Sequence, residues 1–335
     1  MNSKPLNLGI LGTGWIADKM AVTLLEMTCA KAYAVASRSK EKAENFAKKY
    51  SFSKAYGSYE ELADDPQVDL IYIATPHSHH FENSKMCLLK SKPVLCEKAF
   101  TVNAEEAAEL IKISHEKHVF LAEAIWTRYQ PMRKMIAEAV ESGVIGTPKM
   151  LSANLCYPNI AMQRMYDPML AGGALLDLGV YVLNFAAMFF GSDIKSVSSH
   201  CIKYPTGIDA QESITLEYND GKIAVLSSSL IVKSDRQGII SGDKGFIIVE
   251  NVNNPQSFSV YDEDYKLVEK VNCPPQITGY EYQVECCKRA IEEGRVEPVE
   301  MPHAETLRIM RQMDSLRKEW GVKLCNENKQ YEKNN

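Results

Sequence analysis

The sequence lacks the features that mark nucleic-acid-binding and membrane proteins. Its 335 residues contain 38 lysines and arginines against 43 aspartates and glutamates, so the formal net charge is −5, and the basic residues form no block. This balance argues against a nucleic-acid partner. No run approaches the roughly 20 apolar residues of a membrane span, and the chain leads almost at once into a strand-like apolar run. We therefore expect neither a membrane partner nor a signal peptide.

Disulfide and metal signatures are also missing. The nine cysteines form no Cys-x-x-Cys pair, and Cys286 and Cys287 are adjacent, which is poor geometry for a simple structural disulfide. We therefore expect reduced thiols and a cytoplasmic protein. We expect no metal, because no carboxylate or cysteine stands at the spacing of a catalytic zinc site near His77, His79 and His80.

The most informative stretch that the sequence does contain is a glycine turn near its start. An apolar run at residues 6–11 breaks at Gly12-Thr13-Gly14, and a helix-periodic segment follows, with the spacing Gly12-x-Gly14-x-x-Ala17. Between a strand and a helix, these small residues allow a tight turn, a close approach of a pyrophosphate and packing of the helix on the strand. Free N–H groups at the helix start favour the phosphates. We predict a dinucleotide site, with a plain tight turn as the alternative.

The remaining pattern predicts an α/β fold in two parts. Strand-like and helix-like segments alternate over roughly the first 120 residues, which indicates a Rossmann fold with a doubly wound, mostly parallel sheet. An apolar helix at 173–190 and short β-rich runs from 195 to 271 then indicate an α+β part with a large, mostly antiparallel open sheet. We predict a dinucleotide-binding domain at 1–124, a substrate-binding and oligomerisation domain at 125–325, and a disordered tail at 326–335.

The end of the second predicted strand has no carboxylate of the kind that holds the ribose 2′-hydroxyl of NAD. The sequence there is Ala36-Ser37-Arg38-Ser39, and Lys42 follows one helical turn later. A guanidinium at this place can pair with the 2′-phosphate of NADP. We therefore predict NADP. The alternative is that Arg38 is a solvated surface residue and that NAD binds through neutral contacts.

Further motifs carry a family resemblance. They are Ala74-Thr-Pro-His-Ser-His-His80, Cys96-Glu-Lys-Ala99 and Gly172-Gly-Ala-Leu-Leu-Asp-Leu-Gly-Val-Tyr181. Together with the glycine turn, they make the chain resemble the glucose–fructose oxidoreductase and inositol dehydrogenase superfamily over nearly its whole length. The segment Glu123-Ala-Ile-Trp-Thr-Arg128 and the residue Tyr181 resemble the dimeric dihydrodiol dehydrogenase branch, which also oxidises D-xylose and related pyranoses.

Three positions depart from the common pattern of the superfamily. Ala99 stands where proline is usual, and His77 stands where many members have asparagine. Tyr181 stands where sugar and inositol members have histidine, which matches the dihydrodiol branch.

The resemblance implies an oxidoreductase that moves a hydride between NADP, or NAD, and a secondary alcohol or carbonyl of a cyclic diol or sugar. The alcohol must also lose a proton to a base. Asp177 and Tyr181 are four residues apart and share one helix face, and we expect them to meet Lys98 at the substrate. Tyr181 is the candidate acid/base, because nearby positive charge would lower the ordinary tyrosine pKa of about 10. Lys98 is the alternative proton donor, and Asp177 would orient Lys98 or the substrate hydroxyl.

We expect Trp126 and Arg128 to line the substrate pocket, with core packing as the alternative for Trp126. The predicted cofactor-binding residues are Gly12, Thr13, Gly14, Trp15, Ile16, Ser37, Arg38, Lys42, Thr75, His77, His80, Glu97 and Lys98.

Other functions and the assembly state stay open at this point. A non-catalytic NADP-binding sensor on the same fold, or a dehydrogenase of a cyclitol or an open-chain aldehyde, would share the motifs. The superfamily pairs subunits through the sheet of its second domain, and Ile214–Tyr218 and Ile223–Leu230 are apolar enough for such a face. We expect a homodimer, with a tetramer as the alternative.

Overall fold

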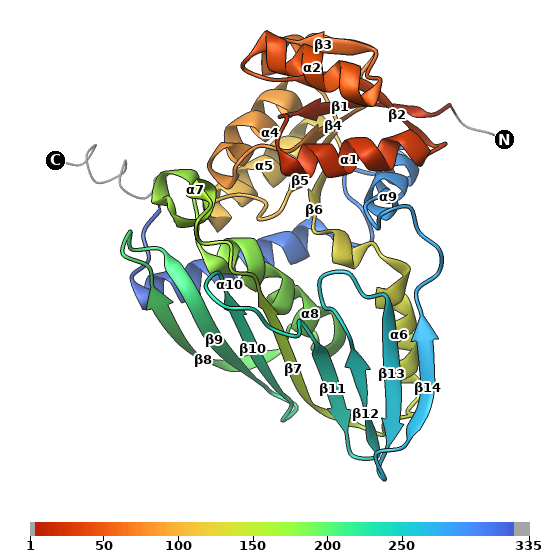
Figure 1. Cartoon of the computed structure of the whole chain (residues 1–335), viewed down its shortest axis with the longest axis vertical. Coiled ribbons are helices and arrows are strands. Elements are labelled where there is room, and N and C mark those ends of the chain that lie inside the picture. The colour runs from red at the N-terminus through yellow and green to blue at the C-terminus, as the bar shows by residue number, and fades with distance from the viewer. Residues whose placement is uncertain (1–3, 325–335) are drawn as a thin grey trace. The chain divides into compact units, whose positions relative to one another are not determined.

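The computed structural model describes residues 4–324, so the predicted tail at 326–335 lies outside the described residues. The chain divides into two compact units (Figure 1). The first contains Met1–Tyr129 and Gln276–Arg311, and the second contains Gln130–Pro275 and Gln312–Asn335.

The first unit is built on a parallel sheet of six strands. In spatial order the strands are β3 (Lys54–Tyr56), β2 (Ala30–Ala36), β1 (Leu6–Leu11), β4 (Leu70–Ile73), β5 (Val94–Glu97) and β6 (Leu121–Ala124). The inner strands are buried along their whole length, as expected of a sheet covered on both faces. The predicted doubly wound Rossmann sheet is confirmed. The half-buried edge strand β3 was not predicted, because three residues give no measurable periodicity.

Helices connect these strands. They are α1 (Trp15–Glu26), α2 (Lys40–Tyr50), α3 (Tyr59–Asp64), α4 (His80–Leu89) and α5 (Ala104–Lys117), with the short turns η1 (His77–His79) and η2 (Trp126–Arg128). The side chains of Ser39, Ser58 and Asn103 cap α2, α3 and α5 by accepting a backbone N–H two or three residues into the helix. The N-terminus of α1 has no such side-chain cap.

The boundaries of the units differ from the predicted domain boundary at residues 124 and 125. Residues 276–311, which we placed in the second domain, belong to the first unit. The reason lies in α9 (Glu281–Glu292), because its residues Val284, Cys287 and Ala290 are fully buried in the hydrophobic core around β1 and α1. Sequence order alone gives no sign that a late helix returns to an early core.

The second unit is built on an eight-stranded sheet, in which only the pair β7–β10 is parallel. In spatial order the strands are β14 (Leu267–Asn272), β13 (Ser257–Asp262), β12 (Gly245–Val249), β11 (Gly238–Gly242), β7 (Pro148–Cys156), β10 (Ile223–Ser229), β9 (Asp209–Tyr218) and β8 (Ile194–Lys203). This confirms the predicted large, mostly antiparallel sheet. Helices α6 (Pro131–Glu141) and α8 (Val180–Phe190) pack together, and α8 contacts β7 and β10. The short α7 (Gln163–Tyr166) and η3 (Pro168–Leu170) precede α8, and α10 (His303–Trp320) is the last helix among residues 4–324.

The sheet does not present the apolar face that we expected from Ile214–Tyr218. Ile214, Leu216 and Tyr218 are buried within the unit, at 1%, 2% and 2% exposure, and the residues between them are polar. On β10, by contrast, Ile223 and Val225 are 41% and 39% exposed, and neighbouring Met150 of β7 is 48% exposed. The exposed apolar residues of this part of the sheet therefore include those of β10 and β7, together with Ile202 of β8, which is 60% exposed.

The expectation that no segment is apolar enough to cross a membrane was wrong on composition. Pro168–Phe190 has 23 residues and is long enough to cross a membrane. An 18-residue window within it has a mean hydropathy of 1.7, and 83% of that window is buried inside the protein. The segment enters α8 through a π-helical turn, η4 (Leu175–Gly179), rather than as a uniform α-helix. Most of its apolar side chains are buried in the second unit, although Met169 is 61% exposed.

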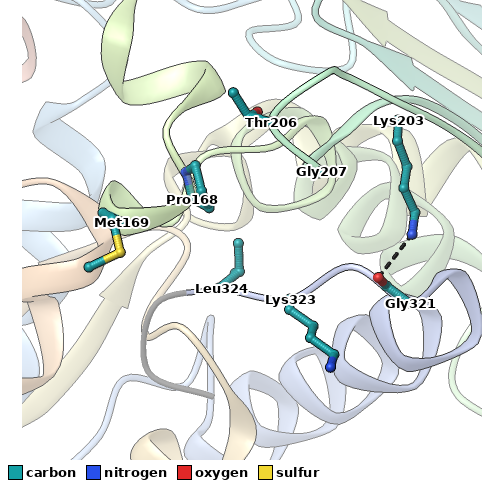
Figure 2. Close-up of a pocket in the computed structure, with 8 residues that line it drawn as sticks. All are labelled: Pro168, Met169, Lys203, Thr206, Gly207, Gly321, Lys323 and Leu324. Carbon is teal, nitrogen blue, oxygen red and sulfur yellow. Dashed lines mark hydrogen bonds between the residues drawn. The ribbon is translucent and has the colours of Figure 1, made fainter. Parts of the chain in front are cut away.

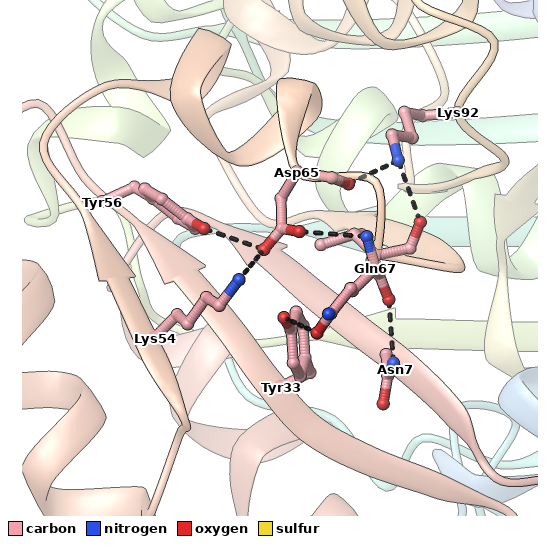
Figure 3. Close-up of polar contacts among 8 residues, drawn as sticks. Asn7, Tyr33, Lys54, Tyr56, Asp65, Gln67 and Lys92 are labelled. Carbon is pink, nitrogen blue, oxygen red and sulfur yellow. Dashed lines mark hydrogen bonds and ion pairs between the residues drawn. The ribbon is translucent and has the colours of Figure 1, made fainter.

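A polar cluster around Asp65 joins the amino-terminal ends of the central strands (Figure 3). Asp65 Oδ2 accepts hydrogen bonds from Lys54 Nζ and from the Tyr56 hydroxyl, both at 2.8 Å, and Asp65 Oδ1 accepts the Gln67 N–H at 3.0 Å. Gln67 in turn bonds Tyr33 and Asn7. Burial alone would raise the pKa of Asp65, but the hydrogen bonds outweigh it and lower the pKa to about 2.

We expect Asp65→Asn to lower the free energy of unfolding by about 1–3 kcal/mol at neutral pH, because charge-assisted hydrogen bonds to a buried carboxylate are lost. A depressed pKa stabilises the fold above the unfolded value of about 3.9, and the contribution fades as the pH falls toward 2. Urea unfolding at several pH values measures this. The matched control is Asp64→Asn, whose side chain is 65% exposed. A wild-type advantage that stays constant from neutral pH to pH of about 2 would contradict the account.

Candidate active site

The glycine turn lies between β1 and α1 at the carboxyl edge of the six-stranded sheet. Gly12 has φ +109°, and a Cβ there would lie 2.7 Å from the Ala74 carbonyl oxygen, so only glycine fits. A Cβ on Gly14 would meet no heavy atom within 4 Å. The strand order reverses at β1, which is where ligands of such sheets bind. The start of α1 has no side-chain cap and the space beside the Gly14 Cα is open, which suits a pyrophosphate.

The residues after β2 lie at the same sheet edge. Ser37 is 8% exposed, and its hydroxyl oxygen accepts the Ser39 N–H at 3.3 Å, which shapes the turn. Arg38 and Lys42 are exposed. The pKa of His79 is lowered mainly by burial and, to a smaller extent, by the positive charge of Arg38. Arg38 therefore lies close enough to the segment after β4 to act on it electrostatically. Arg38 and Lys42 thus have the exposure and charge that a phosphate group requires.

The segment after β4 is held by His80, which is fully buried. Its Nδ1 lies 2.8 Å from the Ala99 carbonyl oxygen, and its Nε2 lies 2.8 Å from the Thr75 carbonyl oxygen. Burial lowers the pKa of His80 to about 4, although both carbonyls favour the charged ring. His77 is buried against the His80 ring, with 5.6 Å between ring centroids. His80 therefore ties the segment after β4 to the residue that follows Lys98.

Lys98 follows β5 directly and is partly exposed. The peptide bond between Lys98 and Ala99 is cis. The preceding Glu97 is 6% exposed and accepts a hydrogen bond from the Tyr72 hydroxyl. Glu123 on β6 is buried beside this strand end, and burial raises its pKa to about 7. Two buried carboxyl groups thus lie in the strands next to the Lys98 segment.

Asp177 and Tyr181 belong to the second unit. Asp177 lies in the π turn η4, is 6% exposed and accepts a hydrogen bond from Arg164 Nη1 at 3.1 Å. Tyr181 is the second residue of α8 and is 8% exposed. Sequence reasoning missed Arg164, because it is 13 residues from Asp177 across an irregular segment with no motif.

Trp126 and Arg128 are both buried in the first unit. The Trp126 ring stacks on Tyr280, with 4.1 Å between centroids and 13° between planes. Arg128 is 5% exposed and donates a hydrogen bond to Glu305. Neither contact was foreseen, because both partners come from the late segment that returns to the first unit.

A cavity of about 310 Å³ in the second unit contains none of the predicted site residues (Figure 2). It is lined by Pro168, Met169, Lys203, Thr206, Gly207, Gly321, Lys323 and Leu324. Lys203 Nζ donates to the Gly321 carbonyl oxygen at 2.9 Å across one side of it. Within residues 4–324, no three histidine, cysteine, aspartate or glutamate side chains are grouped so that they could hold a metal ion.

Two family models match the chain. Residues 6–125 match the oxidoreductase family with an NAD-binding Rossmann fold, and residues 134–248 match the GFO/IDH/MocA C-terminal domain. The first match lies in the first unit and the second match lies in the second unit.

Relatives of known activity match over nearly the whole chain. Trans-1,2-dihydrobenzene-1,2-diol dehydrogenase from Xenopus laevis is 35% identical over 322 residues, which cover 94% of this chain and 98% of that relative. D-xylose 1-dehydrogenase (NADP(+)) from Hypocrea jecorina is 33% identical over 366 aligned positions. The alignment covers 96% of this chain and 93% of that relative.

The fold also matches a solved structure. KijD10, a 3-ketoreductase from Actinomadura kijaniata, was solved with NADP and TDP-benzene. It is 23% identical, with a TM-score of 0.86, and the match covers 94% of this chain and 98% of that chain. The matching domains and the relatives of more than 30% identity show that this chain is a member of the GFO/IDH/MocA oxidoreductase family.

Proposed function

We propose that the protein is an NADP-dependent dehydrogenase that oxidises a secondary alcohol of a cyclic diol or a D-xylose-like pyranose, or reduces the corresponding carbonyl. The observation that carries the proposal is the uncapped start of α1 beside Gly14, with exposed Arg38 at the same sheet edge and no carboxylate after β2. The names of the relatives support the substrate class, because they act on a dihydrodiol and on D-xylose.

The residues of the first unit fit the cofactor. Gly12 and Gly14 leave the α1 N–H groups open to a pyrophosphate, and Arg38 and Lys42 suit a 2′-phosphate. When bound, the nicotinamide accepts or gives the hydride. Lys98 would hydrogen-bond the reacting oxygen with its ammonium group, and the His80 brace would hold the Lys98 segment in place.

The proton must leave the alcohol as the hydride leaves. In the oxidation, Tyr181 as the phenolate would take this proton and become the phenol, and in the reduction the phenol would give the proton back. Asp177 would orient the substrate hydroxyl, and Arg164 would hold the Asp177 carboxylate in position. A sensor protein has no use for an acid/base group, so the presence of Lys98, Asp177 and Tyr181 together favours an enzyme.

We expect Arg38→Ala to weaken NADP binding by about 10- to 100-fold and to leave NAD binding within about threefold, because only NADP carries the 2′-phosphate. Calorimetric titration of both cofactors measures the two dissociation constants. The matched control is Lys48→Ala, an exposed lysine in the last turn of α2. Unchanged NADP affinity in Arg38→Ala would show that a group other than Arg38 binds the 2′-phosphate.

We expect Tyr181→Phe to lower kcat by about 100-fold or more, because the acid/base group is removed while the ring is kept. Its NADP affinity should equal that of the wild type. The assay follows nicotinamide absorbance over a panel of pyranoses and trans-dihydrodiols, with Tyr265→Phe as the exposed control. Normal turnover in Tyr181→Phe would remove Tyr181 from the role, and NADP binding without turnover of any panel member would favour the sensor function.

A further inference from the structure

Two carboxylates on β9, Asp209 and Glu212, are buried against the turn that leads into α8. Their exposed fractions are 1% and 2%, and β9 contacts the π turn η4. Asp209 Oδ2 accepts the Leu175 N–H at 2.5 Å. Glu212 accepts a hydrogen bond from the Ser228 hydroxyl of β10. Neither carboxylate belongs to a motif that the proposed chemistry uses.

Two glycines in this turn, Gly173 and Gly179, allow the two carboxylates to lie close to its backbone. Gly173 has φ +130°, and a Cβ there would lie 2.4 Å from Asp209 Oδ1. A Cβ on Gly179 would lie 2.9 Å from Glu212 Oε1. Asp209 therefore lies against the start of the segment from Gly173 to Gly179, and Glu212 lies against its end.

The geometry of this segment decides where α8 begins. A π turn accommodates one extra residue compared with an α-helical turn, and such turns are rare and concentrated at functional sites. One residue corresponds to about 100° of rotation around a helix. If η4 relaxed to an α-helical turn, the residues before it, including Gly173, would rotate by that amount relative to Tyr181 and α8. The position of Tyr181 relative to the preceding residues therefore depends on a contact that holds the first residues of η4 in the π conformation.

Charge favours Asp209 as the fixing group. Burial raises the pKa of Asp209 to about 6, against the opposing effect of the backbone N–H groups that it accepts and of Arg317. Burial and the charge of Asp209 raise the pKa of Glu212 well above its usual range. Two buried carboxylates this close disfavour a second negative charge, and the Leu175 N–H favours Asp209 as the group that carries the charge. The other ionisable groups around Asp209 include Arg317, which pairs with Asp314 on α10, and two residues of β8, Cys201 and Lys203, of which Lys203 lies opposite Asp209 in the sheet.

We propose that Asp209 is a positioning residue for Asp177 and Tyr181: its carboxylate fixes the start of the π turn by accepting the Leu175 N–H, and Glu212 lies against Gly179 at the end of the turn. The proposal concerns catalysis and so rests on the proposed function, but its structural part does not. Removal of the Asp209 charge should loosen the turn without affecting the glycine turn of the first unit.

The test compares Asp209→Asn with Glu212→Gln and with Glu217→Gln, an exposed glutamate on the same strand. We expect Asp209→Asn to lower kcat by about 10- to 100-fold, because small misplacements of acting groups are costly. NADP affinity should stay within about twofold. Hydrogen exchange at the amides of residues 174–181 should become at least about tenfold faster, while the amides of β1 keep their protection. Glu212→Gln should retain kcat within about threefold, because glutamine keeps the size of the side chain and an oxygen that can accept the Ser228 hydroxyl.

A folded Asp209→Asn protein with wild-type kcat and wild-type exchange at residues 174–181 would overturn the proposal. Uniformly faster exchange across both units would also overturn it, because that result indicates a general loss of stability. If the wild type turned over no substrate, the proposed function would fail, and the exchange measurement alone would still decide whether Asp209 fixes the turn.

If Asp209→Asn does not fold, the wild type provides the second test. Protection of amides 174 and 175, corrected for intrinsic exchange, should fall between a pH of about 7.5 and a pH of about 5, because Asp209 becomes protonated. The β1 amides serve as the internal control. Protection that does not change over this range would contradict the proposed role.

Discussion

The uncapped start of α1 is the constraint on which the rest of this account depends. Helix starts leave N–H groups without partners inside the helix, and a side-chain cap, water or a ligand can satisfy them. Here α2, α3 and α5 have side-chain caps, whereas α1, like α4, α6 and α9, has none. Gly12 bends the chain sharply against Ala74, and the space beside the Gly14 Cα at the start of α1 is open. The site thereby keeps its hydrogen-bond donors for an anionic ligand.

Buried polar groups at the ends of strands set the local geometry in both units. In the first unit, His80 joins the Thr75 and Ala99 carbonyl oxygens and so ties the segments after β4 and β5 together. In the second unit, Asp209 and Glu212 hold the π turn before α8. In both cases a buried ionisable side chain braces the backbone next to a residue that is proposed to act on substrate. Burial makes these contacts costly to leave unsatisfied, so each favours one arrangement.

The sequence allowed the parallel sheet, the antiparallel sheet and the glycine turn to be predicted, because each follows from local periodicity or from a glycine at a fixed position. It did not show that α9 packs Val284 and Cys287 into the first core, since that contact depends on distant segments. The π turn was missed because its residues Leu175–Gly179 are as apolar as the helix that follows. Arg164 and Asp209 were missed because each reaches its partner across an irregular or distant stretch.

The most direct test of the central claim is NADP binding to a Gly14→Val variant. Gly14 has an extended backbone, with φ −87° and ψ −176°, and its Cβ would meet no protein atom within 4 Å. Valine should therefore be tolerated by the fold and should occupy the space next to the α1 N–H groups. The account predicts a melting temperature within a few degrees of wild type and NADP binding weakened by about 100-fold or more in calorimetric titration. Wild-type NADP affinity in the folded variant would contradict it.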